Sequence, residues 1–175
     1  MITRNFIEYQ KWLSGDRYQH YVTLLNGTSE SLNYMADTGR LGNIGALMAN
    51  GVCDSVDHKN GGVYFGRGST PATVDDYKLE QPIESGLTVT NPLGYCVFAP
   101  LPNGDYVYHA SYTVTNAREE AVTIQELGLF SKASGLTHLA LFDRIVLDEP
   151  ILLQPNETTV ITYRVVNRTY RLTTN

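Results

Sequence analysis

Apolar and polar side chains alternate most clearly over residues 105–116. Successive side chains of a strand point to opposite sides of its sheet, so a period of two predicts a half-buried antiparallel strand. Tyrosines would form much of its inner wall. The inner face would carry Tyr106, Tyr108, Ala110, Tyr112 and Val114, and the outer face Val107, His109, Ser111, Thr113 and Thr115.

The next segments extend this pattern. Residues 116–120 are polar, and residues 121–130 are again β-branched and apolar. This predicts a hairpin in which the strand over residues 121–130 pairs with the strand over residues 105–116. A turn through Gly135 then predicts a second hairpin, whose later strand places four aliphatic side chains on one face: Leu139, Leu141, Ile145 and Leu147.

Asp143 interrupts that aliphatic face. Two explanations are open: a bulge that shifts the register, or a partner for the carboxylate such as Arg144 or Arg164. Pro150 and Pro155 bracket residues 151–153, which predicts a short piece at a sheet edge, and a β-branched strand over residues 158–166 closes the chain.

The first residues predict a helix over 3–13, with Thr3 as its cap. Its apolar stripe is Ile2, Phe6, Tyr9 and Leu13, with Trp12 nearby. A helix of this length needs packing to persist, so it docks either on the chain's own sheet, which we favour, or on a neighbouring subunit.

Residues 18–25 predict a strand that ends at the Asn26-Gly27 turn, and residues 28–45 predict a long Gly-rich loop. The glycines of residues 39–45 do not have the spacing of a phosphate-binding loop. We therefore expect an N-terminal arm of helix, strand and loop over 1–45. Residues 46–175 would form an all-β, mainly antiparallel domain, either a β-sandwich or a jelly-roll-like barrel.

Composition limits the classes of function. The chain has 175 residues, of which 42% are hydrophobic, enough for a core that needs neither metal nor disulfide. The net charge of −5 with no Lys/Arg block argues against direct nucleic-acid binding. No apolar run approaches a membrane span and the N-terminus is unlike a signal peptide, so we expect a cytoplasmic start. Cys53 and Cys96 are expected to be packed thiols, with a disulfide as the alternative.

No residues form a catalytic or metal-binding pattern, so we expect no enzyme activity, no metal and no cofactor. The four histidines, His20, His58, His109 and His138, are scattered. The Asp75-Asp76 pair is better explained by capping of a turn than by a metal site. Glu126 lies in an otherwise apolar strand, where an edge or a subunit contact would explain it. Twelve tyrosines suit a protein or glycan contact surface, or a half-buried sheet.

Two ordered series of motifs resemble small structural proteins of tailed bacteriophages, over about residues 46–166. The first is Val63-Tyr64-Phe65-Gly66-Arg67-Gly68-Ser69-Thr70-Pro71 followed by Asp75-Asp76-Tyr77-Lys78-Leu79-Glu80. The second is Glu126-Leu127-Gly128-Leu129-Phe130, Leu139-Ala140-Leu141-Phe142-Asp143-Arg144, Leu147-Asp148-Glu149-Pro150-Ile151 and Leu153-Gln154-Pro155-Asn156-Glu157.

This resemblance implies a virion component of the neck, tail or baseplate, assembled in the host bacterial cytoplasm from copies of this chain and other virion proteins. Sheet edges that need covering agree with assembly. The alternative is a glycan- or receptor-binding β-sandwich module of a tail fibre, with a ligand near Tyr64 and Arg67. The candidate subunit contacts are Phe6, Tyr9, Trp12, Leu13, Tyr64, Arg67 and Glu126.

Overall fold

A computed structural model describes residues 1–13, 21–31, 62–90, 97–100, 102, 106–131 and 139–167. These residues form one helix and nine strands. In chain order they are α1 (Arg4–Leu13), β1 (Tyr21–Thr23), β2 (Ser29–Ser31), β3 (Gly62–Gly66), β4 (Leu87–Thr90), β5 (Val97–Pro100), β6 (Tyr106–Asn116), β7 (Val122–Ser131), β8 (Ala140–Leu153) and β9 (Thr158–Asn167).

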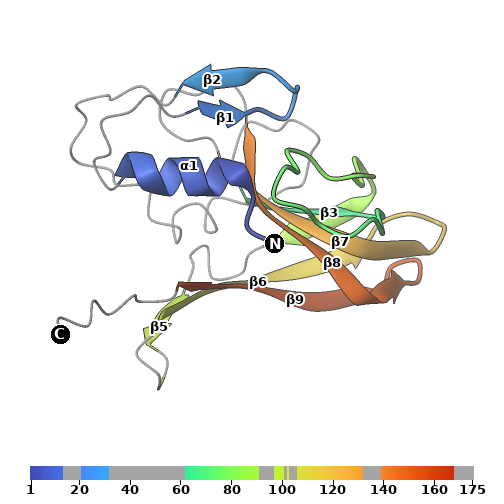
Figure 1. The fold of residues 1–175 in the computed structure, drawn as a ribbon. Coiled ribbons are helices and arrows are strands. Elements are labelled where there is room, and N and C mark those ends of the chain that lie inside the picture. Colours follow the sequence, from blue (N-terminus) through green and yellow to red (C-terminus); the bar gives the residue numbers. More distant parts are fainter. Residues whose placement is uncertain are drawn as a thin grey trace.

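Two antiparallel sheets pack face to face (Figure 1). The upper sheet has the order β3-β7-β8, and the lower sheet is built on β6, which pairs with β4, β5 and β9. One apolar core draws side chains from both sheets, which is the arrangement of a β-sandwich. The all-β, mainly antiparallel fold expected from the sequence is confirmed. The core includes Val63, Phe65, Val89, Tyr112, Val114, Ile124, Leu127, Leu129, Ile161 and Tyr163.

The alternation in β6 has the predicted effect. Ala110, Tyr112 and Val114 are buried, whereas the hydroxyl residues between them are partly exposed. β9 pairs with one edge of β6 from Tyr106 to Thr115. β4 and β5 therefore share the other edge, at opposite ends of the strand.

The predicted hairpin between β6 and β7 is wrong. β6 lies in the lower sheet and β7 in the upper sheet, so the chain crosses the sandwich at this corner. Alternation reveals which side chains face the core, but a strand of either sheet satisfies the same pattern. The corner is held by Asn116, which is fully buried: its Nδ2 donates to the carbonyl oxygens of Glu120 (2.8 Å) and Leu153 (3.0 Å), and its Oδ1 accepts from the Arg118 N–H (3.0 Å).

Replacement of Asn116 by alanine is expected to lower the free energy of unfolding by about 2–3 kcal/mol, because backbone groups at the corner lose their partners. Asn116→Asp should cost at least as much, since a carboxylate oxygen would face the two carbonyl oxygens. Urea denaturation measures both. Glu119→Ala, an exposed change in the same corner, is the control, and an Asn116→Ala variant as stable as that control would contradict the assignment.

The second predicted hairpin is confirmed, since β7 and β8 pair antiparallel. Both explanations offered for Asp143 contribute. The register shifts at Phe142, because Leu129 lies opposite Asp143 while Phe130 lies opposite Leu141. The carboxylate also has a partner, but neither expected arginine provides it: the Tyr163 hydroxyl donates to Asp143 at 2.5 Å. As predicted, residues 151–153 lie at a sheet edge. The expected short, separate piece is wrong, because β8 continues through Pro150 as one strand of 14 residues, Ala140–Leu153.

The N-terminal segment packs on the sandwich. In Figure 1, α1 and the β1–β2 hairpin lie above the upper sheet, beside the start of β8. Phe6 is buried against Phe142, with the ring centroids 5.8 Å apart in an edge-to-face arrangement. The Asn5 side chain donates to the carbonyl oxygens of Thr23 and Leu141 and accepts the Thr23 N–H. Docking of the helix on the chain's own sheet is therefore confirmed.

Thr3 lies at the predicted cap position, directly before α1, and its carbonyl oxygen accepts the N–H groups of Phe6 and Ile7. Its hydroxyl donates to the Leu141 carbonyl oxygen at 2.7 Å, so this side chain also ties the segment to β8. One local expectation at this end needs correction. Residues 29–31 were expected in a loop, but they form β2 and pair with β1 across the predicted Asn26-Gly27 turn. There the positive φ of Gly27, 82°, suits the tight reversal.

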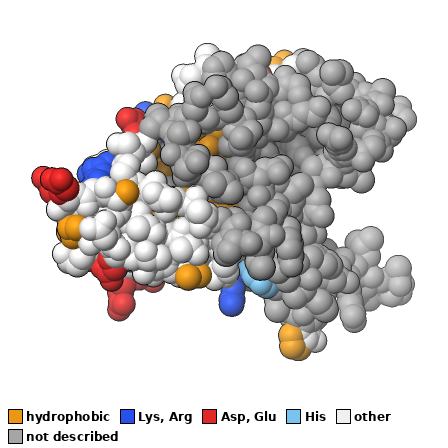
Figure 2. Space-filling view, turned by 180° about the vertical axis from the view of Figure 1, so that it is seen from behind, with side chains coloured by type: hydrophobic (Ala, Val, Ile, Leu, Met, Phe, Trp, Pro, Cys, Tyr) orange, Lys and Arg blue, Asp and Glu red, His pale blue; other side chains and the backbone are white. Residues whose placement is uncertain are grey.

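Some expectations lie outside the described residues: the state of Cys53 and Cys96, the loop over residues 39–45, and the positions of His20, His58 and His138. Within the described ranges, no helix is long and apolar enough to cross a membrane. On the face drawn in Figure 2, hydrophobic side chains of the described part appear mostly as small, separate patches among backbone and side chains that are neither hydrophobic nor charged.

Candidate functional site

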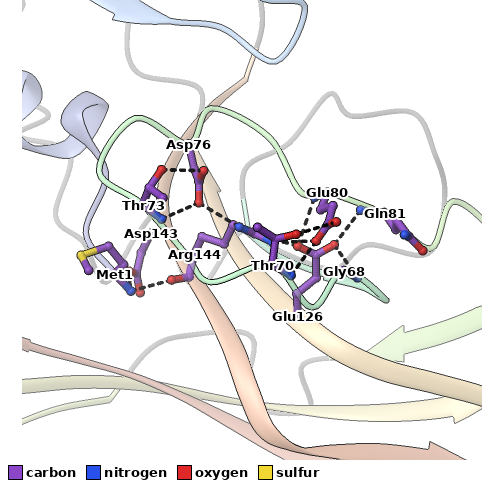
Figure 3. Close-up of polar contacts among 10 residues, drawn as sticks. All are labelled: Met1, Gly68, Thr70, Thr73, Asp76, Glu80, Gln81, Glu126, Asp143 and Arg144. Carbon is purple, nitrogen blue, oxygen red and sulfur yellow. Dashed lines mark hydrogen bonds and ion pairs between the residues drawn. The ribbon is translucent and has the colours of Figure 1, made fainter.

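A buried arginine collects three carboxylates on the outer side of the upper sheet (Figure 3). Arg144 of β8 is only 3% exposed. Its Nε donates to Glu126 Oε2 at 2.8 Å and its Nη1 to Asp76 Oδ2 at 2.9 Å, while its Nη2 lies 3.5 Å from Glu80 Oε2. Alternate side chains of β7 face the core, and Glu126 faces the other way, toward the segment 67–82. We call these four residues the Arg144 cluster.

Glu126 holds the backbone of the segment 67–82 against β7. Its Oε1 accepts the N–H groups of Gly68 (3.0 Å) and Gln81 (2.8 Å), and its Oε2 accepts that of Glu80 (3.1 Å). The carboxylate is fully buried, and with Arg144 it has four donors. Such pairing makes a buried charge tolerable, because the donors replace the water that burial removes.

The carboxylates of Asp76 and Glu80 accept hydrogen bonds within the same segment, 67–82. The Asp76 carboxylate accepts the N–H and the hydroxyl of Thr73, each at 2.9 Å, and so closes the turn that the sequence predicted. Glu80 accepts the N–H and hydroxyl of Thr70. Burial disfavours the charged form of Asp76, yet hydrogen bonds from Thr73 and Arg144 together hold the pKa of its carboxyl below the ordinary value.

The lowered pKa of Asp76 predicts a loss of stability in acid. A carboxyl whose pKa is lower in the folded state stabilises the fold above its unfolded pKa, near 3.8, and this contribution disappears as the pH falls through the folded pKa. Asp76→Asn should therefore be less stable than the wild type at neutral pH, with a difference that shrinks below about pH 4. Urea midpoints across this range measure it.

Thr73→Val is the companion variant, since it removes one donor to Asp76 and should move the acid transition to higher pH. A difference between Asp76→Asn and wild type that stays constant from neutral pH into acid would contradict the role of the Asp76 charge.

Two glycines make room for this arrangement. A side chain at Gly68 would place its Cβ 2.6 Å from Glu126 Oε1 and 2.5 Å from the Glu80 Cβ. At Gly66, a Cβ would collide with the Glu126 carboxylate. The Gly-x-Gly of the first motif series is therefore explained by the close approach of backbone to a buried carboxylate.

A second polar pair lies beside the cluster, facing the core. Asp143 accepts the Tyr163 hydroxyl and lies 3.1 Å from the amino group of Met1. Burial, together with the adjacent Asp143 charge, raises the pKa of Tyr163 well above its ordinary value, so the hydroxyl remains protonated and donates. This pair links β9 of the lower sheet to β8 of the upper sheet.

A mostly apolar cavity of about 150 Å³ lies next to the cluster, where the segment 78–82 meets β3 and β7. Tyr64 lines it, with its ring 5.0 Å from that of Phe130 in an edge-to-face contact. The other lining residues are Leu25, Lys78, Leu79, Glu80 and Pro82. A volume of this size holds a small ring or a branched aliphatic group.

The candidate subunit contacts do not form one site. Phe6 and Glu126 are buried within the chain, so their side chains are taken up by contacts of the chain itself. Arg67 is exposed and Tyr64 is half-buried at the cavity, and both stay predictions. The side chains of Tyr9, Trp12 and Leu13 lie outside the description.

The sequence reasoning missed the importance of Arg144, Asp76 and Glu80. A signal was present: Arg144 and Glu126 each interrupt an apolar strand, and a charge at a buried strand position needs an opposite charge nearby. The β7–β8 hairpin was predicted, but its register and the position of the segment 67–82 were not. In the observed register Gly128 lies opposite Arg144, which brings Arg144 beside Glu126.

Within the described residues, no group of three or more His, Cys, Asp or Glu side chains has an arrangement that could hold a metal ion. Comparisons of the chain with protein-family models, with curated proteins and with solved structures give no match.

Proposed function

We propose that this chain is a non-enzymatic structural protein of a tailed-bacteriophage virion, an oligomeric connector, collar, tail or baseplate component that acts by protein–protein assembly. One observation carries the proposal. The residues that define both motif series, far apart in the sequence, meet in the Arg144 cluster: Gly66, Gly68, Asp76 and Glu80 from the first series, and Glu126 and Arg144 from the second.

The chemistry of the cluster supports a structural role for these motifs. Each carboxylate is occupied by backbone or hydroxyl donors of the segment 67–82 and by Arg144. Arg144 Nη2 is buried without a hydrogen-bond partner, 3.5 Å from Glu80 Oε2, while the Nε and Nη1 of Arg144 and the three carboxylates are hydrogen-bonded and fix the segment 67–82 on the sheet. A fixed loop presents the same surface on every copy of the protein, which repeated assembly contacts require.

The test is the mass of the purified chain by light scattering, followed by location of the chain in the intact particle by electron microscopy. We expect a defined oligomer and copies bound in the particle. A chain that remains monomeric and is absent from purified particles would overturn the proposal.

The cavity beside Tyr64 favours one other candidate, the glycan- or receptor-binding module. A small apolar cavity with Lys78 and Glu80 in its lining combines apolar and hydrogen-bonding surface, as small-ligand sites do. Titration of a monomer with oligosaccharides, followed by Tyr64→Ala, separates the two functions. Saturable binding that Tyr64→Ala abolishes, by a chain that does not oligomerise, would favour the module.

A further inference from the structure

Within the described residues, the chain itself covers the β3 edge of the upper sheet and the first part of its β8 edge. Beyond β3, the Arg67 N–H donates to the Gln81 carbonyl oxygen and the Ile83 N–H to that of Phe65. Beyond β8, the Thr3 N–H donates to Phe142 and the Arg144 N–H to Met1. β8 also carries Pro150 and two shifts of register, features that discourage pairing with another strand.

The edge of the lower sheet at β9 is different, because no described segment covers it. β9 pairs with β6 over ten consecutive residues without a shift of register. Among the described residues no strand pairs with the other edge of β9. The strand Thr158–Asn167 contains no proline and no lysine, the residues that usually protect an edge. It therefore presents a long row of backbone N–H and C=O groups suited to another strand.

Covering the side chains around this edge costs little desolvation free energy. On the outer face, Ser111 and Thr162 form a hydroxyl–hydroxyl hydrogen bond of 2.9 Å, and Thr115 and Thr158 form one of 2.8 Å. Because these hydroxyls already have partners, removal of water from them costs less. Val160, between the two threonines of β9, is 64% exposed and gains most from being covered.

The charges near β9 select the orientation of a partner. Glu157 lies just before the strand and Arg164 lies in its second half, and both are exposed. If a second β9 pairs antiparallel about a twofold axis at Ile161, Arg164 of each copy lies opposite Thr158 of the other, next to its Glu157. Glu157 Oε2 accepts the Gln154 N–H at 2.7 Å, which holds this carboxylate at the turn before the strand. Opposite charges would then lie near each other at both ends of the contact, whereas a parallel pairing in register would place like charges together.

We propose that β9 is the edge through which two copies of this chain pair, antiparallel and about a twofold axis, so that the lower sheet continues from one copy into the other. This inference rests on the proposed assembly function and specifies its first contact. It is an isologous contact, in which each copy offers the same strand.

The test uses the full chain and sedimentation equilibrium over a range of concentrations. The double variant Val160→Lys with Thr162→Lys places lysines opposite lysines across the axis, and should raise the Kd of the dimer by about 100-fold or more. Leu152→Lys is the matched control, because Leu152 is a 55% exposed strand residue of the other sheet, and it should leave the Kd unchanged.

A charge exchange tests the orientation. Arg164→Glu alone should weaken the dimer, and Arg164→Glu combined with Glu157→Arg should restore it. Hydrogen exchange provides an independent measurement, since β9 amides should be protected in the dimer and exchange faster on dilution. Far-UV circular dichroism and urea denaturation establish that each variant is folded.

The outcomes separate the two proposals. An oligomer whose mass is unchanged by the lysine pair, or a charge exchange that fails to restore pairing, overturns the β9 contact and leaves the assembly function standing. A wild-type chain that is monomeric at every concentration overturns the β9 contact. If that chain is also absent from particles, both proposals fall.

Discussion

Glu126→Ala is expected to lower the free energy of unfolding by about 3–5 kcal/mol, the cost of breaking a buried ion pair by removal of one partner. The change leaves the N–H groups of Gly68, Glu80 and Gln81 without their acceptor and Arg144 without its closest carboxylate. Urea denaturation at neutral pH measures the loss.

The effect should be largest in the segment 67–82. Hydrogen exchange should show the amides of this segment losing protection before those of β6, since Glu126 is their common acceptor. Glu149→Ala removes the same type of side chain from an exposed position, and it should change stability by no more than about 0.5 kcal/mol. Equal effects of the two substitutions would show that the cluster does not stabilise the fold.

Phe142→Ala is expected to cost about 3–5 kcal/mol, the range for removal of a buried aromatic ring. Phe142 is the extra residue at the register shift in β8, and its ring is fully buried against Phe6 of α1. The substitution should therefore loosen the helix as well as open a cavity. Thermal unfolding gives the first effect, and hydrogen exchange of the α1 amides gives the second.

A double-mutant cycle with Phe6→Ala measures the coupling. The two rings touch, so the combined loss should be smaller than the sum of the single losses by about 0.5–1.5 kcal/mol. Ile7→Ala, at a position of α1 that is 40% exposed, is the control. Strict additivity of the two phenylalanine substitutions would mean that the helix is held elsewhere.

The sequence predicted those elements for which local pattern is sufficient. Alternation located β6 and its buried Tyr112, and β-branched runs located β7 and β9. The Asn26-Gly27 turn was predictable because a glycine with positive φ favours a reversal there. The pairing of β7 with β8 was predicted correctly, but the pairing of β6 with β7 was not, although their connection is shorter, because the same alternation suits a strand of either sheet.

The Arg144 cluster could not be predicted because it depends on pairing between distant segments. Asp76 and Arg144 are 68 residues apart, and Glu126 accepts the Gly68 N–H from 58 residues away. The sequence predicts that Asp76 caps a turn, and its carboxylate does accept the Thr73 N–H. Its second role appears only once β8 lies beside β7 and the segment 67–82 covers both.

The corner at Asn116 also constrains the order in which the chain folds. β6 and β9 pair across a separation of 43 residues between Thr115 and Thr158, and the β7–β8 hairpin lies between them in the sequence. Early closure of that hairpin would shorten the effective loop between β6 and β9 and bring the end of β6 close to the end of β8. These two ends meet at the corner, where the Asn116 side chain donates to the Leu153 carbonyl oxygen. We therefore expect the lower sheet to be the slow, non-local part of folding, with β9 joining last, so that the edge proposed for a second copy would be complete only when the rest of the sandwich is in place.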